Sequence, residues 1–292
     1  MTKILVTGAT GQLGRQTIEF LRRRVPDDRI VALARDPDIL SELASSGIEV
    51  RRGDYLDRRG LVSAFKGIEK VLLVSASAFT DRLTQHANVI AAAKEAGVRH
   101  VVYTSIQRKA LSPMLLTTVT EYDIETEAAL RASGLDYTIL FNSLYLDALP
   151  MILGEKLPVG GVRVPGGGGK GTLVARRDLA EANAVVLTQD GHENRSYTLG
   201  ASEAVSFSDM AKVFSAIAGT LVPYVETSVQ DYVAAQVAAG LPEPVAAFLA
   251  EWVQAVAVGE YAEVTGDLER LIGHRPTTCA EFLTAKYAKL AE

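Results

Sequence analysis

Near its N-terminus the chain reads Ile4-Leu5-Val6-Thr7-Gly8-Ala9-Thr10-Gly11-Gln12-Leu13-Gly14, and a helical pattern follows to Leu21. This is an apolar strand that runs into three glycines with the spacing G-x-x-G-x-x-G. In a βαβ unit such glycines allow the tight turn, the close approach of a pyrophosphate, and the packing of helix on strand. The free N–H groups at the helix N-terminus favour phosphate. The stretch therefore predicts a dinucleotide-binding loop, with cofactor contacts at Gly8, Thr10, Gly11, Gln12, Leu13 and Gly14.

The order of elements up to Phe141 predicts a parallel sheet. Short β-branched or apolar runs alternate with helical segments, the runs being 4–6, 30–33, 48–50, 71–74, 101–103 and 137–140. Continuous apolar strands separated by helices are typical of a sheet that is covered on both faces. Right-handed crossovers then favour the Rossmann-type doubly wound topology of the α/β class.

After Phe141 the pattern becomes mostly helical. We expect helices over 178–188, 208–218 and 230–258, and short strands at 196–198 and 222–225. We therefore predict an NAD(P)-binding Rossmann domain over 1–150, to which some later segments return, and a smaller, mostly helical substrate-binding lobe over 151–292.

Composition excludes several classes of protein. The net charge of −5, from 35 acidic and 30 basic residues, gives no reason to expect binding to nucleic acid or to an anionic membrane. The single cysteine, Cys279, cannot form a disulfide within the chain, and we expect a cytoplasmic protein. No signal-peptide pattern or membrane-spanning apolar run is present. The scattered histidines predict no metal site. The sequence leaves open whether the protein forms a homodimer.

The end of the second strand bears on the choice of cofactor. An acidic residue there would bind the ribose hydroxyls of NAD, whereas a basic residue would bind the 2′-phosphate of NADP. Arg35 occupies this position and favours NADPH, although Asp36 follows directly, so NADH is the alternative.

Two further strand ends are expected to contact the cofactor. Gly53, Asp54 and Tyr55 follow the third strand and could border the adenine. Ser75, Ala76 and Ser77 follow the fourth strand, at the crevice where the strand order reverses. The alternative at each position is an ordinary loop residue.

The chain resembles the NmrA-like, atypical short-chain dehydrogenase/reductase family, and is most similar to its NAD(P)H:quinone oxidoreductase type 2 and triphenylmethane reductase branch. The resemblance spans nearly the whole chain, with matching segments at 7–14, 34–35, 53–55, 103–105, 125–127, 142–145, 177–180 and 271–278. It implies NADPH in the Rossmann domain and two-electron reduction of a quinone or a similar flat, electron-poor acceptor. It also implies cofactor contacts at Asn142 and Tyr145.

The same resemblance raises a question about catalysis. Standard short-chain dehydrogenases use a Tyr-x-x-x-Lys pair, whereas the alignment places Val119 and Asp123 at the two positions. Asp123 also stands where the quinone reductase branch usually has a histidine. Direct hydride transfer needs orientation and a dry pocket more than proton transfer. We therefore expect neither flavin nor metal, with Ser105, Tyr122, Asn142 and Tyr145 as catalytic candidates.

Two other functions remain open at this point. The first is a non-catalytic redox sensor of the NmrA type, which binds NADP(H) and reports its oxidation state to a protein partner. The second is a reductase of another carbonyl or imine substrate.

The glycine-rich stretch 160–172 differs from a nucleotide-triphosphate loop because Gly171 separates Lys170 from Thr172, and we expect a mobile loop at the substrate site instead.

Overall fold

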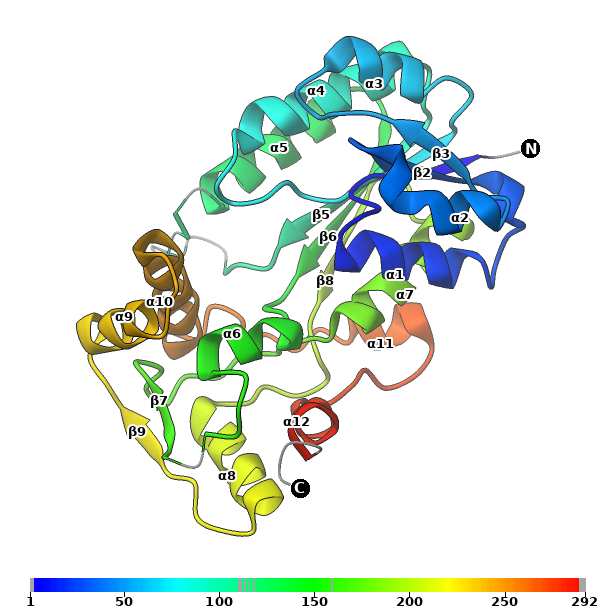
Figure 1. Ribbon diagram of the computed structural model, residues 1–292. Coiled ribbons are helices and arrows are strands. Elements are labelled where there is room, and N and C mark those ends of the chain that lie inside the picture. The colour runs from blue at the N-terminus through cyan, green and yellow to red at the C-terminus, as the bar shows by residue number, and fades with distance from the viewer. Residues whose placement is uncertain are drawn as a thin grey trace. The chain divides into compact units, whose positions relative to one another are not determined.

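The central sheet of the protein has seven strands in the order β3-β2-β1-β4-β5-β6-β8 (Figure 1). The computed structural model describes residues 3–109, 112, 114, 116–117, 119–158 and 160–288. The strands are β1 (Ile4–Val6), β2 (Ile30–Ala34), β3 (Glu49–Arg52), β4 (Lys70–Leu73), β5 (His100–Ile106), β6 (Asp136–Asn142) and β8 (Arg195–Leu199). Every pairing from β3 through to β6 is parallel. The predicted Rossmann-type doubly wound sheet is confirmed.

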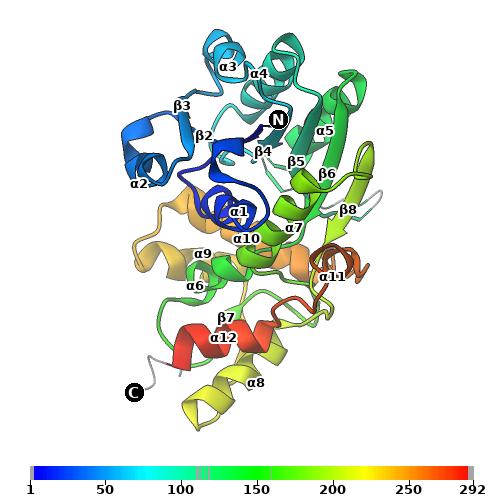
Figure 2. The same ribbon diagram turned by 90° about the vertical axis from the view of Figure 1, so that its right-hand side faces the viewer.

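Helices cover both faces of this sheet. On one face lie α3 (Arg58–Ala64), α4 (Arg82–Glu95) and α5 (Thr120–Ala132), and on the other lie α1 (Gln12–Leu21) and α7 (Arg176–Thr188), as Figures 1 and 2 show. The short α2 (Ser41–Ser45) follows β2, and single turns of 3-10 helix occur at 27–29, 37–40 and 146–148. Strands β1, β2, β4 and β5 are buried along their whole length, which is why they are continuously apolar or nearly so.

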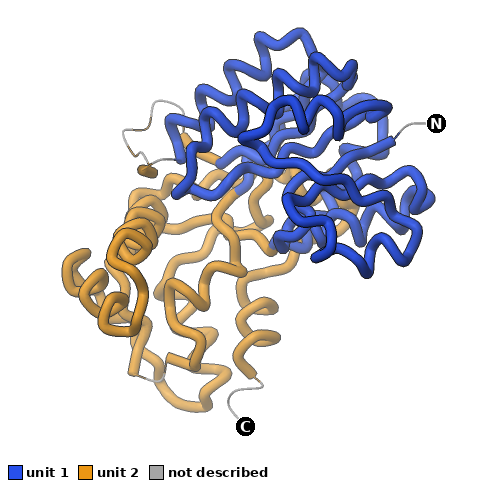
Figure 3. Tube along the Cα trace, turned by 45° about the horizontal axis from the view of Figure 1, so that its top comes forward, with its two compact units in different colours: residues 1–106, 118–142, 176–198 blue, residues 107–117, 143–175, 199–292 orange. Residues whose placement is uncertain are grey.

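The chain forms two compact units, coloured separately in Figure 3. The first contains residues 1–106, 118–142 and 176–198, and the second contains 107–117, 143–175 and 199–292. The first unit therefore includes α7 and nearly all of β8, which come late in the sequence.

The second unit is mainly helical. Its helices are α6 (Leu149–Leu153), α8 (Phe207–Ala218), α9 (Val229–Ala238), α10 (Glu243–Ala257), α11 (Asp267–Ile272) and α12 (Cys279–Tyr287), and its small parallel sheet pairs β7 (Val162–Val164) with β9 (Tyr224–Glu226). The single helix predicted over 230–258 is wrong. Gly240 has φ +100° and Pro242 has no N–H to donate, so α9 ends and α10 begins separately.

The sheet places its switch point between β1 and β4. The chain leaves β1 toward β2 and β3, then returns to β4 on the other side of β1. Loops from these two strands diverge at their carboxyl ends, where doubly wound sheets bind ligands.

No helix in the described part of the chain is both long and apolar enough to cross a bilayer. The same residues bring together no group of three or more His, Cys, Asp or Glu that could hold a metal ion.

Candidate functional site

The glycine loop after β1 leaves room for a phosphate. Gly8 has φ +59°, a conformation that costs glycine little. A Cβ on Gly14 would lie 2.3 Å from the Gly8 carbonyl oxygen, so α1 packs directly on the loop. Gly11 caps α1 without a side chain, and the first N–H groups of the helix have no partner within it. This loop therefore fits the pyrophosphate of a dinucleotide.

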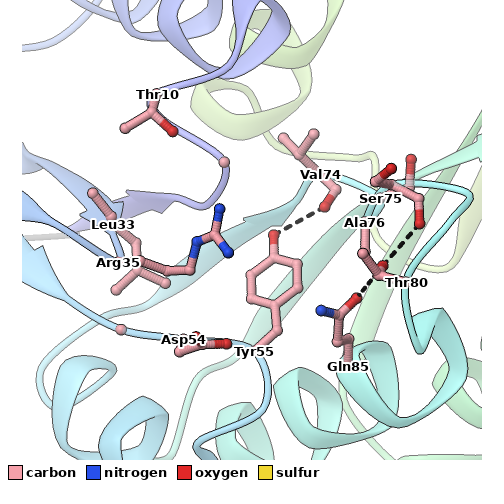
Figure 4. A pocket seen from close by; sticks show the side chains of 14 residues that line it. Thr10, Leu33, Arg35, Asp54, Tyr55, Val74, Ser75, Ala76, Thr80 and Gln85 are labelled. Carbon is pink, nitrogen blue, oxygen red and sulfur yellow. Dashed lines mark hydrogen bonds between the residues drawn. The ribbon is translucent and has the colours of Figure 1, made fainter. Parts of the chain in front are cut away.

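Beside the loop, a pocket of about 220 Å³ opens at the carboxyl ends of the strands (Figure 4). It is lined by predicted cofactor contacts from four separate loops, namely Gly8, Thr10, Arg35, Asp54, Tyr55, Ser75, Ala76 and Ser77. Gly53, expected beside Asp54, lines it as well, and its other lining residues are Leu33, Ala34, Val74, Thr80 and Gln85. The structure thus brings residues that are up to 77 positions apart in the sequence, from Gly8 to Gln85, around one space.

Some predicted contacts lie outside this pocket lining. Leu13 and Gly14 are buried and serve the packing of α1. Gly11 and Gln12 are exposed, and Gln12 Oε1 accepts a hydrogen bond of 2.8 Å from Arg176 Nη1. Asn142 and Tyr145 are not lining residues either.

Five residues of the pocket lining were not predicted from the sequence. Leu33 and Ala34 are the last two residues of β2 and Val74 follows β4, so attention to the last residues of each strand would have found them. Gly53, which was expected to border the adenine, does line the pocket, and a Cβ there would lie 2.7 Å from Leu33 Cδ1. Thr80 and Gln85 are joined by a hydrogen bond of 2.8 Å and carried no sequence signal.

The two charged residues after β2 have different roles. Arg35 is exposed and lines the pocket, toward which its guanidinium points (Figure 4). Asp36 caps the following helical turn, because its carboxylate accepts a hydrogen bond of 3.2 Å from the N–H of Asp38. The cation rather than the carboxylate is therefore presented to a bound ligand.

Tyr55 contributes its ring to the pocket while its hydroxyl anchors neighbouring loops. The hydroxyl lies 2.9 Å from the Val74 carbonyl oxygen and within hydrogen-bonding distance of the Thr7 hydroxyl. Thr7 Oγ1 in turn accepts from the N–H of Val74 at 3.0 Å. Burial raises the pKa of Tyr55 well above its usual range, so the phenol stays neutral.

The loop 75–77 is held in one orientation by side chains behind it. Thr104 Oγ1 accepts from the N–H of Ser75 at 2.9 Å. His86 Nε2 accepts from the N–H of Ala76 at 2.9 Å, and Arg82 Nη1 donates to the Ala76 carbonyl at 2.6 Å. Both backbone polar groups of Ala76 are thus satisfied by side chains of α4, and the opposite side of the loop is left to face the pocket.

A buried polar network supports these contacts. Arg82 forms an ion pair with Asp123 of α5, and the side chains are 6% and 1% exposed. Tyr103 donates to the same Asp123 oxygen at 2.5 Å. Burial raises the pKa of Asp123, against the opposing effects of Arg82 and the Tyr103 hydroxyl. Asp123 is therefore a structural partner of Arg82 in the core of the first unit.

His86 is neutral in this network. Burial, and after it the charge of Arg82, lowers its pKa to about 3. Its Nε2 accepts from Ala76, so the proton is assigned to Nδ1, which lies 3.0 Å from Thr126 Oγ1. Thr126 Oγ1 can accept a hydrogen bond from Nδ1–H because the Thr126 hydroxyl itself donates to the Tyr122 carbonyl at 2.6 Å.

The four catalytic candidates differ in their surroundings. Ser105 is almost fully buried near the end of β5 and donates to Glu127 Oε1 at 2.5 Å. Asn142 ends the adjacent β6 in register with Ile106, and it is also buried. Tyr122 is half-buried on α5. Tyr145 belongs to the second unit, where its backbone bridges to Val174.

The glycine-rich stretch 160–172 lies in the second unit. Part of it forms β7, and a Cβ on Gly169 would lie 2.2 Å from the Val256 carbonyl oxygen. Thr172 is fully buried, with its hydroxyl 3.0 Å from the Tyr261 carbonyl oxygen. This hydroxyl is therefore not placed to hold a metal–phosphate, and the stretch packs tightly at Gly169.

A doubly wound sheet with a glycine loop after its first strand and an arginine at the end of its second strand is typical of NAD(P)-binding proteins of the Rossmann type. The model of the NmrA-like family matches residues 1–292, and the chain belongs to this family.

Relatives of known activity match over almost the full length. Quinone oxidoreductase 2 of Escherichia coli (strain K12) is 39% identical, over 95% of this chain and 96% of its own. NAD(P)H azoreductase of Xenophilus azovorans is 31% identical, over 98% of each chain. The crystal structure of Citrobacter sp. triphenylmethane reductase complexed with NADP(H) is 34% identical with a TM-score of 0.89, over 97% of this chain and 99% of that one. These relatives show that the chain is an NAD(P)H-dependent oxidoreductase.

Proposed function

We propose that the protein transfers hydride from NADPH to a quinone or a similar flat, electron-poor acceptor. Solved relatives with related activities, among them the Escherichia coli NADPH-dependent quinone oxidoreductase complexed with NADPH, support the proposal. That structure is 38% identical, with a TM-score of 0.89 over 97% of this chain and 99% of that one.

One observation carries the choice of NADPH. Arg35 lines the pocket beside the glycine loop, while Asp36 is engaged in capping the next turn. A guanidinium binds a phosphate through charge-assisted hydrogen bonds, and a carboxylate at this position would repel it. The residues present therefore fit an adenosine 2′-phosphate.

The rest of the first unit orients and shields the cofactor. NADPH, when bound, supplies a hydride, which is one proton with two electrons. One further proton from solvent completes the hydroquinone. The loop 75–77, held by Arg82 and His86, forms a fixed wall beside the glycine loop. The neutral state of His86 and of Tyr55 avoids extra charge behind that wall.

We further propose that Ser105 and Asn142 orient the acceptor from the ends of β5 and β6, with Tyr122 and Tyr145 as additional candidates. The first two side chains come from paired strands, and hydroxyl or amide groups at such positions can stabilise a developing oxyanion. Ser105→Ala and Asn142→Ala should each lower kcat with a quinone by roughly tenfold or more, while leaving the Kd for NADPH nearly unchanged. A Kd that rises in step with the loss of kcat would assign these residues to cofactor binding instead.

The test of function is NADPH oxidation by purified protein with a panel of quinones, azo dyes and triphenylmethane dyes. Turnover with a quinone supports the proposal. Tight NADPH binding with no turnover on any acceptor would instead favour the NmrA-type redox sensor, an alternative suggested by the burial of Asp123 where short-chain dehydrogenases use a catalytic residue. Turnover only with carbonyl or imine compounds would favour another reductase.

The absorption spectrum of the same preparation tests the absence of flavin. Full activity in protein with no flavin absorbance supports direct transfer from nicotinamide to acceptor. A stoichiometric bound flavin, with activity lost on its removal, would refute it.

A further inference from the structure

A second hollow lies next to the cofactor pocket in the first unit. The two share Arg35, Gly53 and Asp54, and the second has a volume of about 550 Å³. Its other lining residues are Arg51, Arg52, Asp57, Gly60, Ser63 and Ala64. Three arginines therefore face a space that adjoins the proposed adenosine site.

Of these arginines, Arg51 is already engaged. Its Nε donates to Glu49 Oε1 at 2.7 Å, and its Nη1 donates to the carbonyl oxygens of Ala64 and Lys66 at 2.5 and 2.8 Å. These bonds fix the guanidinium against β3 and the end of α3. Arg51 is a structural cation with little capacity left for a ligand.

Arg35 and Arg52 are in the opposite situation. Both are exposed, and neither has a hydrogen bond or ion pair to any residue in the described ranges. Arg52 is the last residue of β3 and is paired in register with Ala34, the residue before Arg35. Since neighbouring strands lie about 4.8 Å apart, the two long side chains start close enough to reach one phosphate.

The acidic lining residues do not neutralise this pair directly. Asp57 Oδ1 caps α3 by accepting from the N–H of Gly60 at 3.0 Å. Asp54 Oδ1 accepts from the N–H of Leu56 at 2.9 Å. Each carboxylate thus has an oxygen committed to its own loop, and the guanidinium groups of Arg35 and Arg52 are uncommitted cationic donors in the hollow.

We propose that Arg52 is a specificity-determining residue, which binds the 2′-phosphate of the adenosine moiety together with Arg35. This inference rests on the proposed use of NADPH. A phosphomonoester carries close to two negative charges near neutral pH, so two guanidinium groups can each donate to it. NADH has a neutral hydroxyl at the same position, and Arg52 would add little to its affinity. The selection of NADPH is therefore shared between two neighbouring strand ends.

The experiment is calorimetry on the full chain with adenosine 2′,5′-bisphosphate and with 5′-AMP, which differ only in the 2′-phosphate. We expect the wild type to bind the bisphosphate more tightly. Arg52→Gln should weaken bisphosphate binding about tenfold, in line with the loss of a hydrogen bond between charged groups, and leave 5′-AMP binding unchanged. Arg52→Lys should retain part of the preference, because it keeps the charge but loses the planar fork.

Arg24→Gln is the matched control, since Arg24 is an exposed arginine three residues beyond the end of α1 that lines neither hollow. It should leave both affinities unchanged, which separates a local contact from a change in net charge. Equal losses for the two ligands in Arg52→Gln, no loss for either, or a wild type with no preference would each overturn the inference.

Because the readout is binding, the two proposals can fail separately. A protein that shows the Arg52-dependent preference but reduces no acceptor supports the role of Arg52 and refutes the proposed catalysis. If the protein reduces quinones with NADPH while Arg52→Gln keeps full bisphosphate affinity, the proposed catalysis is supported and the role of Arg52 is refuted.

Discussion

The buried pair of Arg82 and Asp123 allows stability and cofactor binding to be separated. In Asp123→Asn, the side-chain oxygen that accepts from Tyr103 is kept and only the negative charge is lost. The Arg82 guanidinium is then left buried without its counter-ion. Breaking a buried ion pair from one side typically costs about 3–5 kcal/mol, because the remaining charge is desolvated and unpaired. We expect the free energy of unfolding to fall by about that amount.

A surface ion pair provides the matched control. Arg58 and Glu95 are joined at 2.9 Å, but both side chains are about half exposed. Glu95→Gln removes the same charge in water and should cost less than about 1 kcal/mol. Urea denaturation of the two variants side by side measures the difference.

The triple variant Arg82→Met, Tyr103→Phe, Asp123→Leu removes the polar set together. Apolar residues of similar size often replace a buried ion pair with little loss, so much of the stability should return. The Ala76 carbonyl, however, loses the donor that holds it. NADPH should then bind about tenfold more weakly, because the Ala76 carbonyl on the pocket wall is left without a hydrogen-bond donor.

Calorimetry with NADPH on the triple variant completes this test. The reasoning is refuted if Asp123→Asn costs no more than Glu95→Gln. It also fails if the triple variant is stable and binds NADPH as tightly as the wild type, because Arg82 would then have no role in positioning the loop.

Three further outcomes are expected. Gly14→Ala should abolish measurable NADPH binding and destabilise the fold, since its Cβ would lie 2.3 Å from a backbone oxygen; calorimetry and thermal unfolding report both. Arg35→Asp should raise the KM for NADPH far more than that for NADH, and equal increases would contradict the assignment. His86 and His100 have pKa values lowered by burial to about 3 and about 4. The unfolded chain takes up protons near pH 6.5 while the folded one does not, so stability should fall by about 2 kcal/mol per histidine from pH 7 to pH 5; a flat urea midpoint over that range would contradict it.

Several features could be predicted from local sequence because their causes are local. The turn conformation of Gly8 and the packing of Gly14 depend on residues within one βα unit, so the G-x-x-G-x-x-G spacing was enough to locate the loop. Strand positions followed from apolar runs, since strands buried on both faces must be apolar. The break between α9 and α10 was also visible in Gly240 and Pro242, and the single predicted helix ignored that signal.

The remaining features depend on residues that are distant in sequence. Asp123 stood at a position associated with catalysis, and only the fold shows that Arg82, which is 41 residues away, holds it in the core. Arg52 carried no motif, and its importance arises because β3 pairs with β2 and places it beside Arg35. Thus the sequence alone determined the dinucleotide loop and the class of sheet, whose hydrogen bonding and sterics are local. The tertiary structure decided which charges are buried with partners and which are left for a ligand, because desolvation and pairing depend on the neighbours that folding brings together.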